Sequence, residues 1–406
     1  MKHEEGVSTH FPCFDGLRAI AATFVLLHHA GFTTGTSMKH HGIGPYLERM
    51  DSGVTIFFLI SGFLLYRPFV VAHLSGRRPL GAVKFYGRRV LRIFPAYWVA
   101  LIGIVTFFGL ELHGAKSAAI YGGLVQIYDK KRFFGGISQA WSLATEISFY
   151  LVLPAYAWLV ARVARRSANR VRVELVALAV LIGAGLAYRT LLFPVDPGPA
   201  TYKNLMRYWL PAHVDLFGIG MLLAVVSAAG QVGGHEWGVA RAVGRVPSVV
   251  WWAFAALCLY LVSWHVGLPD GLQDGTPWQE WQRHALYAGM SLFLLLPAVF
   301  GPQPRGVVRR FLASPPMYGL GLVSYGVYVW HQAWLGKAMD WTDGQLFDAS
   351  LWKVAGIAFV CTVVTATASY LLVEKPILRL KDRPFLRARP DTADQEDLPA
   401  LAEVAP

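Results

Sequence analysis

The sequence predicts an all-α membrane protein, a polytopic bundle of about ten transmembrane helices with both termini in the cytoplasm. Two features of the composition point to this class. Of the 406 residues 55% are hydrophobic and only 15% are charged, well below the roughly 25% of soluble domains. The third observation is distribution, because apolar stretches of about 20 residues, long enough to span a bilayer as helices, recur along the chain.

The predicted spans are separated by short polar loops. They run approximately over residues 17–34, 53–72, 93–112, 142–161, 174–194, 208–229, 248–266, 285–302, 317–338 and 351–373. The interval 113–141 holds an apolar piece too short to span, which is expected to be interfacial or re-entrant. A transmembrane domain is thus predicted over residues 14–380, after a cytoplasmic segment 1–13 and before a disordered cytoplasmic tail 381–406.

The orientation follows from the loop charges. With the N-terminus inside, the inner loops carry sixteen Lys and Arg residues and the outer loops nine, as the positive-inside rule requires. The formal net charge of +12 is therefore explained first by topology and second by an anionic ligand. Nucleic acid is not expected as a partner, whereas the lipid bilayer is.

Two ionisable residues of the first predicted span, Arg18 and His29, fall on one helical face. His29 follows Arg18 by eleven positions, which returns the side chain to within about 20° of the same direction. Their axial separation is about 16 Å. This spacing suits a long ligand with an anionic head at Arg18 and a reactive end at His29, as in phosphopantetheine-linked acyl groups. The alternative is a snorkelling arginine and a histidine that only packs between helices.

Three more titratable residues are predicted near the depth of His29, namely Glu146, Asp215 and His331. All four fall roughly 18–24 Å from the inner edge of the membrane when the rise of a helix is applied to the predicted spans. Ionisable groups at membrane depth are costly and usually functional. Four of them on four helices indicate a lined cavity, although each one alone is also compatible with a structural hydrogen bond.

The strongest basic cluster lies in the segment KFYGRRVLRIFP, where Arg88, Arg89 and Arg92 occur within five residues. Arg88 and Arg92 share a helical face because they are four residues apart. One interpretation is a topology anchor among lipid headgroups. The other is a collar of phosphate-binding arginines at the cytoplasmic mouth of the cavity.

Taken together, seven motifs in order resemble the acyltransferase-3 family of integral membrane O-acyltransferases. They are FDGLRAIAATFVLLHH, FFLISGFLL, FYGRRVLRIFPAYW, WSLATEISFYLVLP, HVDLFGIGMLLA, SYGVYVWH and SYLLVEKP, spread over residues 14 to about 380. The sequence departs from the family pattern after Glu146, where many members have a second Glu and this chain has Ile147.

The resemblance implies transfer of an acyl group, with acetyl as the default, from cytoplasmic acyl-CoA to a hydroxyl of a glycan, glycolipid or glycosylated natural product. It implies no permanently bound cofactor and no metal. His29 would be the general base or a covalent acyl carrier. Glu146 would orient its imidazole, and Tyr150 would donate to a developing oxyanion. Arg18, with Arg88, Arg89 or Arg92, would hold the coenzyme phosphates.

Further candidates for the cavity lining or the substrate site come from the same motifs. They are Asp15, Ser61, Trp141, Ser142, Asp215, Ser324, Tyr325, His331 and Glu374. Two alternatives remain open at this level. One is a multi-pass transporter or exporter of a lipid-linked or small-molecule substrate, and the other is a different membrane acyltransferase fold in which His331 is the catalytic histidine. The sequence does not indicate the acceptor, the donor chain length or the oligomeric state.

Overall fold

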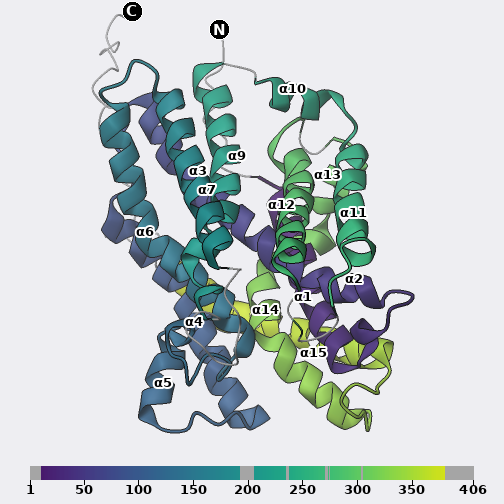
Figure 1. Cartoon of the computed structure of the whole chain (residues 1–406). Coiled ribbons are helices and arrows are strands. Elements are labelled where there is room, and N and C mark those ends of the chain that lie inside the picture. Colours follow the sequence, from purple (N-terminus) through teal and green to yellow (C-terminus); the bar gives the residue numbers. More distant parts are fainter. Residues whose placement is uncertain are drawn as a thin grey trace, which may run out of the picture.

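The protein is a bundle of long helices joined by short helices and turns (Figure 1). The computed structural model describes residues 11–192, 205–234, 237–269, 273, 275–302 and 305–379. Within them the long helices are α1 (Cys13–Thr33), α3 (Gly53–Ser75), α4 (Ala82–Phe108), α6 (Trp141–Ala164), α7 (Arg170–Leu192), α9 (Val214–Gly233), α11 (Ser248–Trp264), α12 (Pro277–Val299), α14 (Pro315–Trp341) and α15 (Leu351–Ser369).

The helical character of the chain is confirmed, and each of the ten predicted spans overlaps one long helix. Six helical stretches of the described residues are long and apolar enough to cross a membrane, or seven if the bent pair α10 (Gly238–Arg245) and α11 forms one span. Helices α1, α12 and α14 fall outside that group. The chain is therefore a multi-pass membrane protein, and the number of ten spans stays a prediction.

Shorter elements connect these helices. The interval 113–141, predicted to be too short to span, contains α5 (Ala115–Gly122) and the 3-10 turns Gln126–Tyr128 and Ser138–Ala140. The remaining short helices are α2 (Gly44–Glu48), α13 (Val307–Leu312) and α16 (Lys375–Leu378). The predicted tail 381–406 lies outside the described residues.

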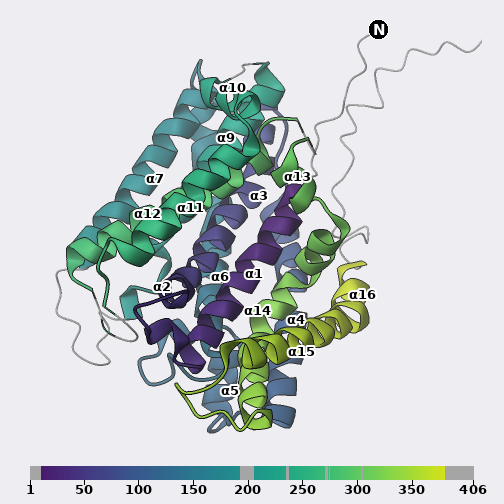
Figure 2. The ribbon, with the colours of Figure 1, turned by 90° about the vertical axis from the view of Figure 1, so that its right-hand side faces the viewer.

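Helix α1 occupies the middle of the bundle. It packs along α14 on one side and α3 on the other, and Figure 2 shows it running between these two helices, with α11 and α12 beside them. Its inner positions Ala19, Ala21 and Ala22 are buried. Small residues let helix backbones approach closely inside a membrane, so α1 can bring Arg18 and His29 near side chains of several neighbours.

Helices α3 and α9 pack closely along each other, and two glycines make the approach possible. A methyl group added at Gly62 would lie 2.1 Å from the backbone oxygen of Phe217, and one at Gly220 would lie 2.1 Å from that of Leu59. Both distances are far below van der Waals contact, so only glycine fits. Because Gly62 faces α9, its neighbour Ser61 is turned toward α6.

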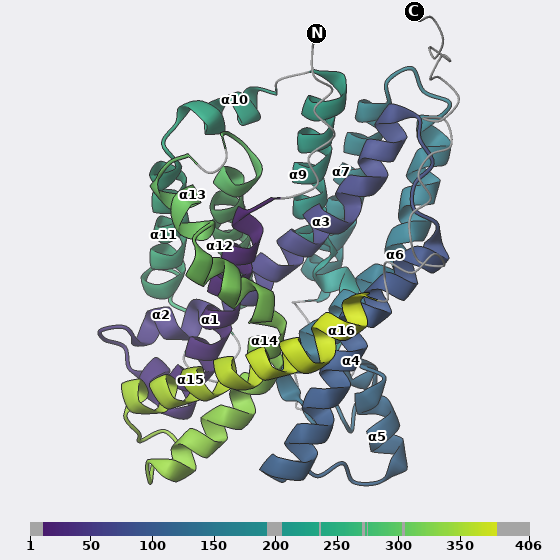
Figure 3. The same cartoon turned by 180° about the vertical axis from the view of Figure 1, so that it is seen from behind.

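Helix α15 crosses behind α14 and ends in one π-helical turn, Tyr370–Glu374, that leads into α16. Figure 3 shows this segment reaching the region of α4, and both the π-turn and α16 pack against α4. Single π-helical turns inside α-helices occur frequently at functional sites. Here the turn places Leu378 against the cavity that the arginines of α4 line.

Candidate functional site

A cavity of about 460 Å³ lies between α1, α3, α4, α6 and α14 and is called the arginine cavity below. Ten predicted site residues line it: Arg18, Ser61, Arg88, Arg89, Arg92, Ser142, Glu146, Tyr150, Ser324 and Tyr325. Residues from distant parts of the sequence thus meet in one place. The predicted grouping of Arg18 with the arginines of α4 is found in the structure.

The arginine cavity is strongly basic. Arg18 donates from Nη1 to Asp15 Oδ1 at 2.8 Å, which fixes its guanidinium group. The guanidinium of Arg89 lies 6.0 Å from the ring centre of Tyr150. The Nε atom of Arg89 is buried and has no hydrogen-bond partner in the described part of the chain. Buried polar groups are normally paired, so this arrangement fits an anionic ligand that supplies acceptors.

Glu146 lies in the same cavity as the arginines. Its Oε1 accepts a short hydrogen bond from the hydroxyl of Ser61, and it lines the cavity together with Arg18 and Tyr150. The interpretation of Glu146 as the residue that orients His29 is therefore wrong, because the ring of His29 has other partners. Glu146 belongs to the Arg18 end of the site.

His29 and His331 form a pair where α1 crosses α14. Nδ1 of His29 lies 3.2 Å from Nε2 of His331, and the ring centres are 4.9 Å apart. His331 is fully buried, whereas His29 is partly exposed. Neither histidine lines the arginine cavity. The predicted closeness in depth of these two residues is found, and their direct contact is a new feature.

The hydrogen bonds of this pair assign its protons. Nδ1 of His29 lies 2.8 Å from the carbonyl oxygen of Val25, and Nδ1 of His331 lies 2.7 Å from that of Tyr328. A carbonyl oxygen only accepts, so both Nδ1 atoms carry the hydrogen. The Nδ1–H of His29 is therefore shared between two acceptors, the carbonyl oxygen of Val25 and Nε2 of His331. As a result, Nε2 of His29 keeps its lone pair and is the basic atom of the pair.

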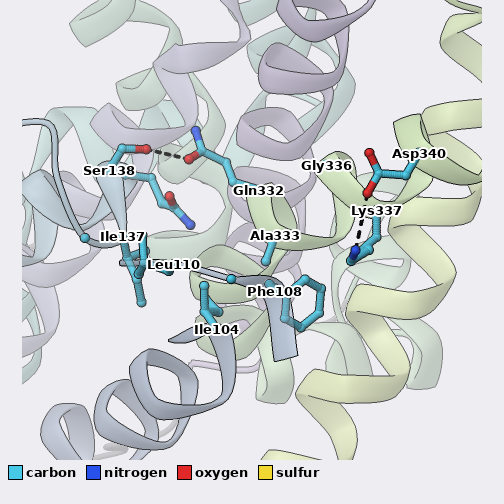
Figure 4. Close-up of a pocket in the computed structure, with 13 residues that line it drawn as sticks. Ile104, Phe108, Leu110, Ile137, Ser138, Gln332, Ala333, Gly336, Lys337 and Asp340 are labelled. Carbon is cyan, nitrogen blue, oxygen red and sulfur yellow. Dashed lines mark hydrogen bonds and ion pairs between the residues drawn. The ribbon is translucent and has the colours of Figure 1, made fainter. Parts of the chain in front are cut away.

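A second cavity, of about 420 Å³, lies along the other end of α4 and α14 and is called the Lys337 cavity below. Figure 4 shows its polar groups. Ser138 Oγ donates to Gln332 Oε1 at 2.5 Å, and Lys337 Nζ lies 3.3 Å from Asp340 Oδ2. The ring of Phe108 supplies an apolar wall. Hydroxyl, amide and charged groups beside an aromatic ring form a surface suited to a sugar.

The two cavities lie on either side of the histidine pair along α14. Ser324, Tyr325 and Tyr328 line the arginine cavity, whereas Gln332 and Lys337 line the Lys337 cavity. His331 occupies the turn between the two sets. The same division holds along α4, where Arg92 faces the first cavity and Phe108 the second.

Hydrogen-bonded side chains lie between the arginine cavity and the Lys337 cavity. The hydroxyl of Tyr328 donates to the backbone oxygen of Gln139 at 2.8 Å and lies 2.7 Å from Ser142 Oγ. Nε2 of Gln139 in turn donates to the backbone oxygen of Val329 at 2.8 Å. These three residues, Tyr328, Gln139 and Ser142, are called the partition.

Several predicted site residues lie elsewhere. Asp215 was expected in a cavity with His29, but its Oδ2 lies 2.5 Å from His284 Nε2 on α12 and it lines neither cavity. The ring of Trp141 packs against His213 and Tyr208. Glu374 is buried in the π-helical turn near Arg92, beside the arginine cavity.

Some residues of the site were missed by sequence reasoning. Tyr328 lies within the motif SYGVYVWH, three residues after Tyr325 and three before His331. That helical spacing indicates that the three side chains share one side of α14. Gln139 and Ser138 carry no such signal, since they belong to a loop whose path depends on tertiary contacts.

The chain was compared with known proteins. The family model described as acyltransferase domain matches residues 11–374. The peptidoglycan O-acetyltransferase OatA of Listeria monocytogenes is 24% identical over 91% of this chain and 56% of its own length. Nodulation protein 10 of Rhizobium leguminosarum is 26% identical over 93% of this chain and 96% of its own. The exopolysaccharide production protein ExoZ of Rhizobium meliloti is 24% identical over 87% and 95%.

The chain spans little more than half the length of some curated relatives that it matches, as with OatA. No solved structure matches the chain. The family model nevertheless covers both the arginine cavity and the histidine pair, since it extends from before α1 to the π-helical turn. The chain therefore belongs to the acyltransferase-3 family of integral membrane proteins.

Proposed function

We propose that this protein is a membrane O-acyltransferase that moves an acetyl group from acyl-CoA to a hydroxyl group of a glycan. The proposal rests on the order of three features along α14. They are the basic arginine cavity, the histidine pair, and the Lys337 cavity, whose polar groups and aromatic ring suit a sugar. A group-transfer enzyme with two dissimilar substrates needs a site for each and a basic atom between them.

The donor would bind in the arginine cavity. Arg18, Arg88, Arg89 and Arg92 all line it, and the guanidinium fork matches phosphate oxygens. The unpaired buried Nε of Arg89 supports a ligand with acceptor oxygens. Arg18 and His29 lie eleven residues apart on one helix, about 16 Å along its axis. A phosphopantetheine arm is long enough to carry a thioester over that distance.

The chemistry would take place at Nε2 of His29. As a general base, this atom takes the proton of the acceptor hydroxyl while the oxygen attacks the thioester carbonyl. A carbon–oxygen bond forms, the carbon–sulfur bond breaks, and the proton passes to the departing thiolate. His331 holds Nδ1–H of His29 and stabilises the imidazolium, as the third member of a triad does. A covalent acyl-histidine intermediate uses the same lone pair.

The acceptor would enter through the Lys337 cavity. Ser138, Gln332, Lys337 and Asp340 provide donors and acceptors for sugar hydroxyls beside the ring of Phe108. The relatives support a glycan, since one is named a peptidoglycan O-acetyltransferase and another an exopolysaccharide production protein. Because the partition separates the cavities, transfer requires Tyr328 to move or the acyl group to pass beside it.

The proposed orientation places the arginine cavity toward the cytoplasm, with ten spans and both termini inside. The excess of Lys and Arg in the predicted inner loops supports it. In a chain whose three cysteines are replaced by serine, a cysteine at Asn169, in an exposed loop that we propose to be cytoplasmic, should react with a membrane-impermeant maleimide only after the cells are opened. A cysteine at Lys39 should react in intact cells. The reverse labelling would overturn the orientation.

The decisive experiment uses His29→Ala in the full chain, reconstituted in lipid nanodiscs with labelled acetyl-CoA and a glycan acceptor. Loss of a general base should lower acetyl transfer by roughly 10²- to 10⁴-fold. His28→Ala is the matched control, because His28 lies on the same turn and its Nδ1 contacts the backbone oxygen of Leu47 instead. Wild-type transfer by His29→Ala would overturn the proposal.

A transporter is the main rival, because buried carboxylates and a multi-pass bundle suit it equally well. A transporter would leave acetyl-CoA intact in the absence of a gradient. Purified protein that releases free coenzyme A from acetyl-CoA in an acceptor-dependent manner would exclude transport as the sole activity. Uptake of a glycan precursor without release of coenzyme A would favour the transporter.

A further inference from the structure

A third cavity, of about 360 Å³, lies where α3 ends, between the last turns of α6 and the start of α7. Among the residues that line it are His73, Arg77, Arg78, Arg165 and Arg170. None of its lining residues is acidic. Four guanidinium groups around one small cavity repel one another unless an anion lies between them.

The fold holds this cavity open by a defined arrangement at the end of α3. Arg170 Nη1 donates to the backbone oxygen of His73 at 3.0 Å, which caps a carbonyl that the helix leaves unpaired. Gly76 follows with a φ of +74° and turns the chain sharply. Arg77 and Arg78 come directly after this turn, so both are directed to the same cavity as Arg170.

A buried histidine in the wall of this third cavity, His73, is a second indication of a ligand. His73 is 7% exposed, and its Nδ1 lies 2.6 Å from Glu174 Oε1. The carboxylate of Glu174 is fully buried and also accepts from the hydroxyl of Tyr66 at 2.6 Å. Nε2 of His73, on the ring edge away from Glu174, is buried and has no hydrogen-bond partner within the described ranges.

This pairing prepares His73 to hold an anion. Glu174 accepts a hydrogen bond from Nδ1–H of His73, and a ring that carries hydrogen on both nitrogens presents Nε2–H as a donor to a ligand oxygen. A buried polar atom without a partner needs an explanation, and a bound ligand oxygen supplies one. Arginine is the preferred residue for phosphate oxygens, because its planar fork bonds two of them at once.

We propose that this cavity, the His73 pocket, binds the phosphate group of a ligand beside the arginine cavity. Leu65 of the arginine cavity and Ala72 of the His73 pocket are seven residues apart on α3, about 10 Å along the helix. The phosphate can come from an anionic phospholipid or from the ribose phosphate of the acyl-CoA. Only the second source rests on the proposed function.

The test compares two pairs of substitutions in the full chain. Arg77→Gln with Arg165→Gln removes two charges from the His73 pocket, and both side chains are exposed and form no hydrogen bond within the described residues. The control, Arg166→Gln with Arg172→Gln, removes two exposed charges from the same region that do not line the pocket. Arg170 is left unchanged because it caps α3.

Two direct binding assays distinguish the sources. In the first, calorimetry measures adenosine 3′,5′-bisphosphate binding to protein in phosphatidylcholine nanodiscs. In the second, native mass spectrometry measures phosphatidylglycerol retained from mixed nanodiscs. The pocket variant should lose at least about tenfold in one assay while the control keeps wild-type binding. A loss in the first identifies the nucleotide, and a loss in the second identifies the lipid.

If the two pairs of substitutions weaken binding equally, or if neither weakens it, the proposed phosphate site in the His73 pocket is overturned. These arginines would then serve only as charges that orient the chain in the membrane. Neither assay uses acyl transfer. A protein that binds phosphatidylglycerol through this pocket but never releases coenzyme A from acetyl-CoA would therefore contradict the proposed function and not the pocket.

Discussion

His29 on α1 and His331 on α14 meet through their ring nitrogens, Nδ1 to Nε2 at 3.2 Å. The contact joins residues 302 positions apart in the sequence, and the carbonyl oxygens of Val25 and Tyr328 fix the hydrogen on Nδ1 of each ring. It makes His331 a positioning residue, because His331 acts on the reacting atoms only through His29. A histidine that merely fills space between helices would not influence the protonation of its neighbour.

The first prediction concerns this role of His331. His331→Ala removes one of the two acceptors of Nδ1–H of His29 and leaves only the carbonyl oxygen of Val25, so the imidazolium that forms on His29 during the reaction is less stabilised. We expect kcat to fall by roughly 10²-fold with little change in the KM for acetyl-CoA, and the pH dependence of kcat to shift. His331→Gln retains an acceptor oxygen and should recover part of the loss.

The measurement is the pH profile of kcat for wild type, His331→Ala and His331→Gln in nanodiscs. A purely structural role would lower the amount of folded protein without moving the profile. An unchanged profile in His331→Ala, together with a normal kcat per folded molecule, would remove His331 from the mechanism.

The sequence was sufficient for the helical class because the signal is local. A span needs about 20 apolar residues, and such runs were read directly at α3 and α15, whose starts at Gly53 and Leu351 match the predicted ones. The arginine cavity was also predictable, since a shared motif order links Arg18 with the arginines of α4. The helical class could be predicted from residues within one segment, and the arginine cavity from the order of several motifs.

The position of Glu146 was not predictable in this way. Its depth was inferred from the rise along one helix and from assumed span ends, and that calculation ignores tilt and the displacement of helices relative to one another. In the structure Glu146 lies with Ser61 and Arg18. The partner of Asp215, His284, was missed for a related reason, because nothing in the two sequence segments shows that α9 and α12 are neighbours.

The second prediction concerns the arginine cavity. Arg18→Ala should raise the KM for acetyl-CoA roughly 10- to 100-fold, since a hydrogen bond to a charged group contributes about 1.5–3 kcal/mol. The kcat at saturating donor should change much less, because Arg18 is remote from Nε2 of His29. Steady-state kinetics over a range of acetyl-CoA concentrations measures both constants.

Arg162→Ala is the matched control for Arg18→Ala. Arg162 is exposed near the end of α6 and lies outside the arginine cavity, so its loss removes the same charge without removing a ligand contact. If the two variants raise KM equally, the effect is one of overall charge and Arg18 does not bind the donor.

The third prediction concerns the partition. Tyr328→Ala removes the ring between the cavities together with its hydrogen bonds to Gln139 and Ser142. Exclusion of water protects reactive intermediates from hydrolysis, so we expect acceptor-independent hydrolysis of acetyl-CoA to rise several-fold. Tyr328→Phe keeps the ring and should show a much smaller rise. Release of coenzyme A without acceptor measures the leak, and equal rates in all three proteins would show that Tyr328 separates nothing.

The fourth prediction assigns Asp215 to stability. Its carboxylate is 2% exposed and bonds to His284, and removing one partner of a buried pair typically costs about 3–5 kcal/mol. Asp215→Ala should therefore lower the thermal midpoint of unfolding by several degrees, whereas Asp340→Ala, at an exposed carboxylate, should not.

The same variants separate stability from catalysis. Asp215 lines neither the arginine cavity nor the Lys337 cavity, so folded Asp215→Ala should keep a wild-type KM for acetyl-CoA and a kcat within a small factor of wild type. Replacing both partners, as Asp215→Leu with His284→Leu, leaves neither member of this pair buried without the other and should recover part of the lost stability. A normal unfolding midpoint combined with a kcat reduced a hundredfold would instead place Asp215 in the reaction, with the acceptor reaching α9 by a route that neither cavity provides.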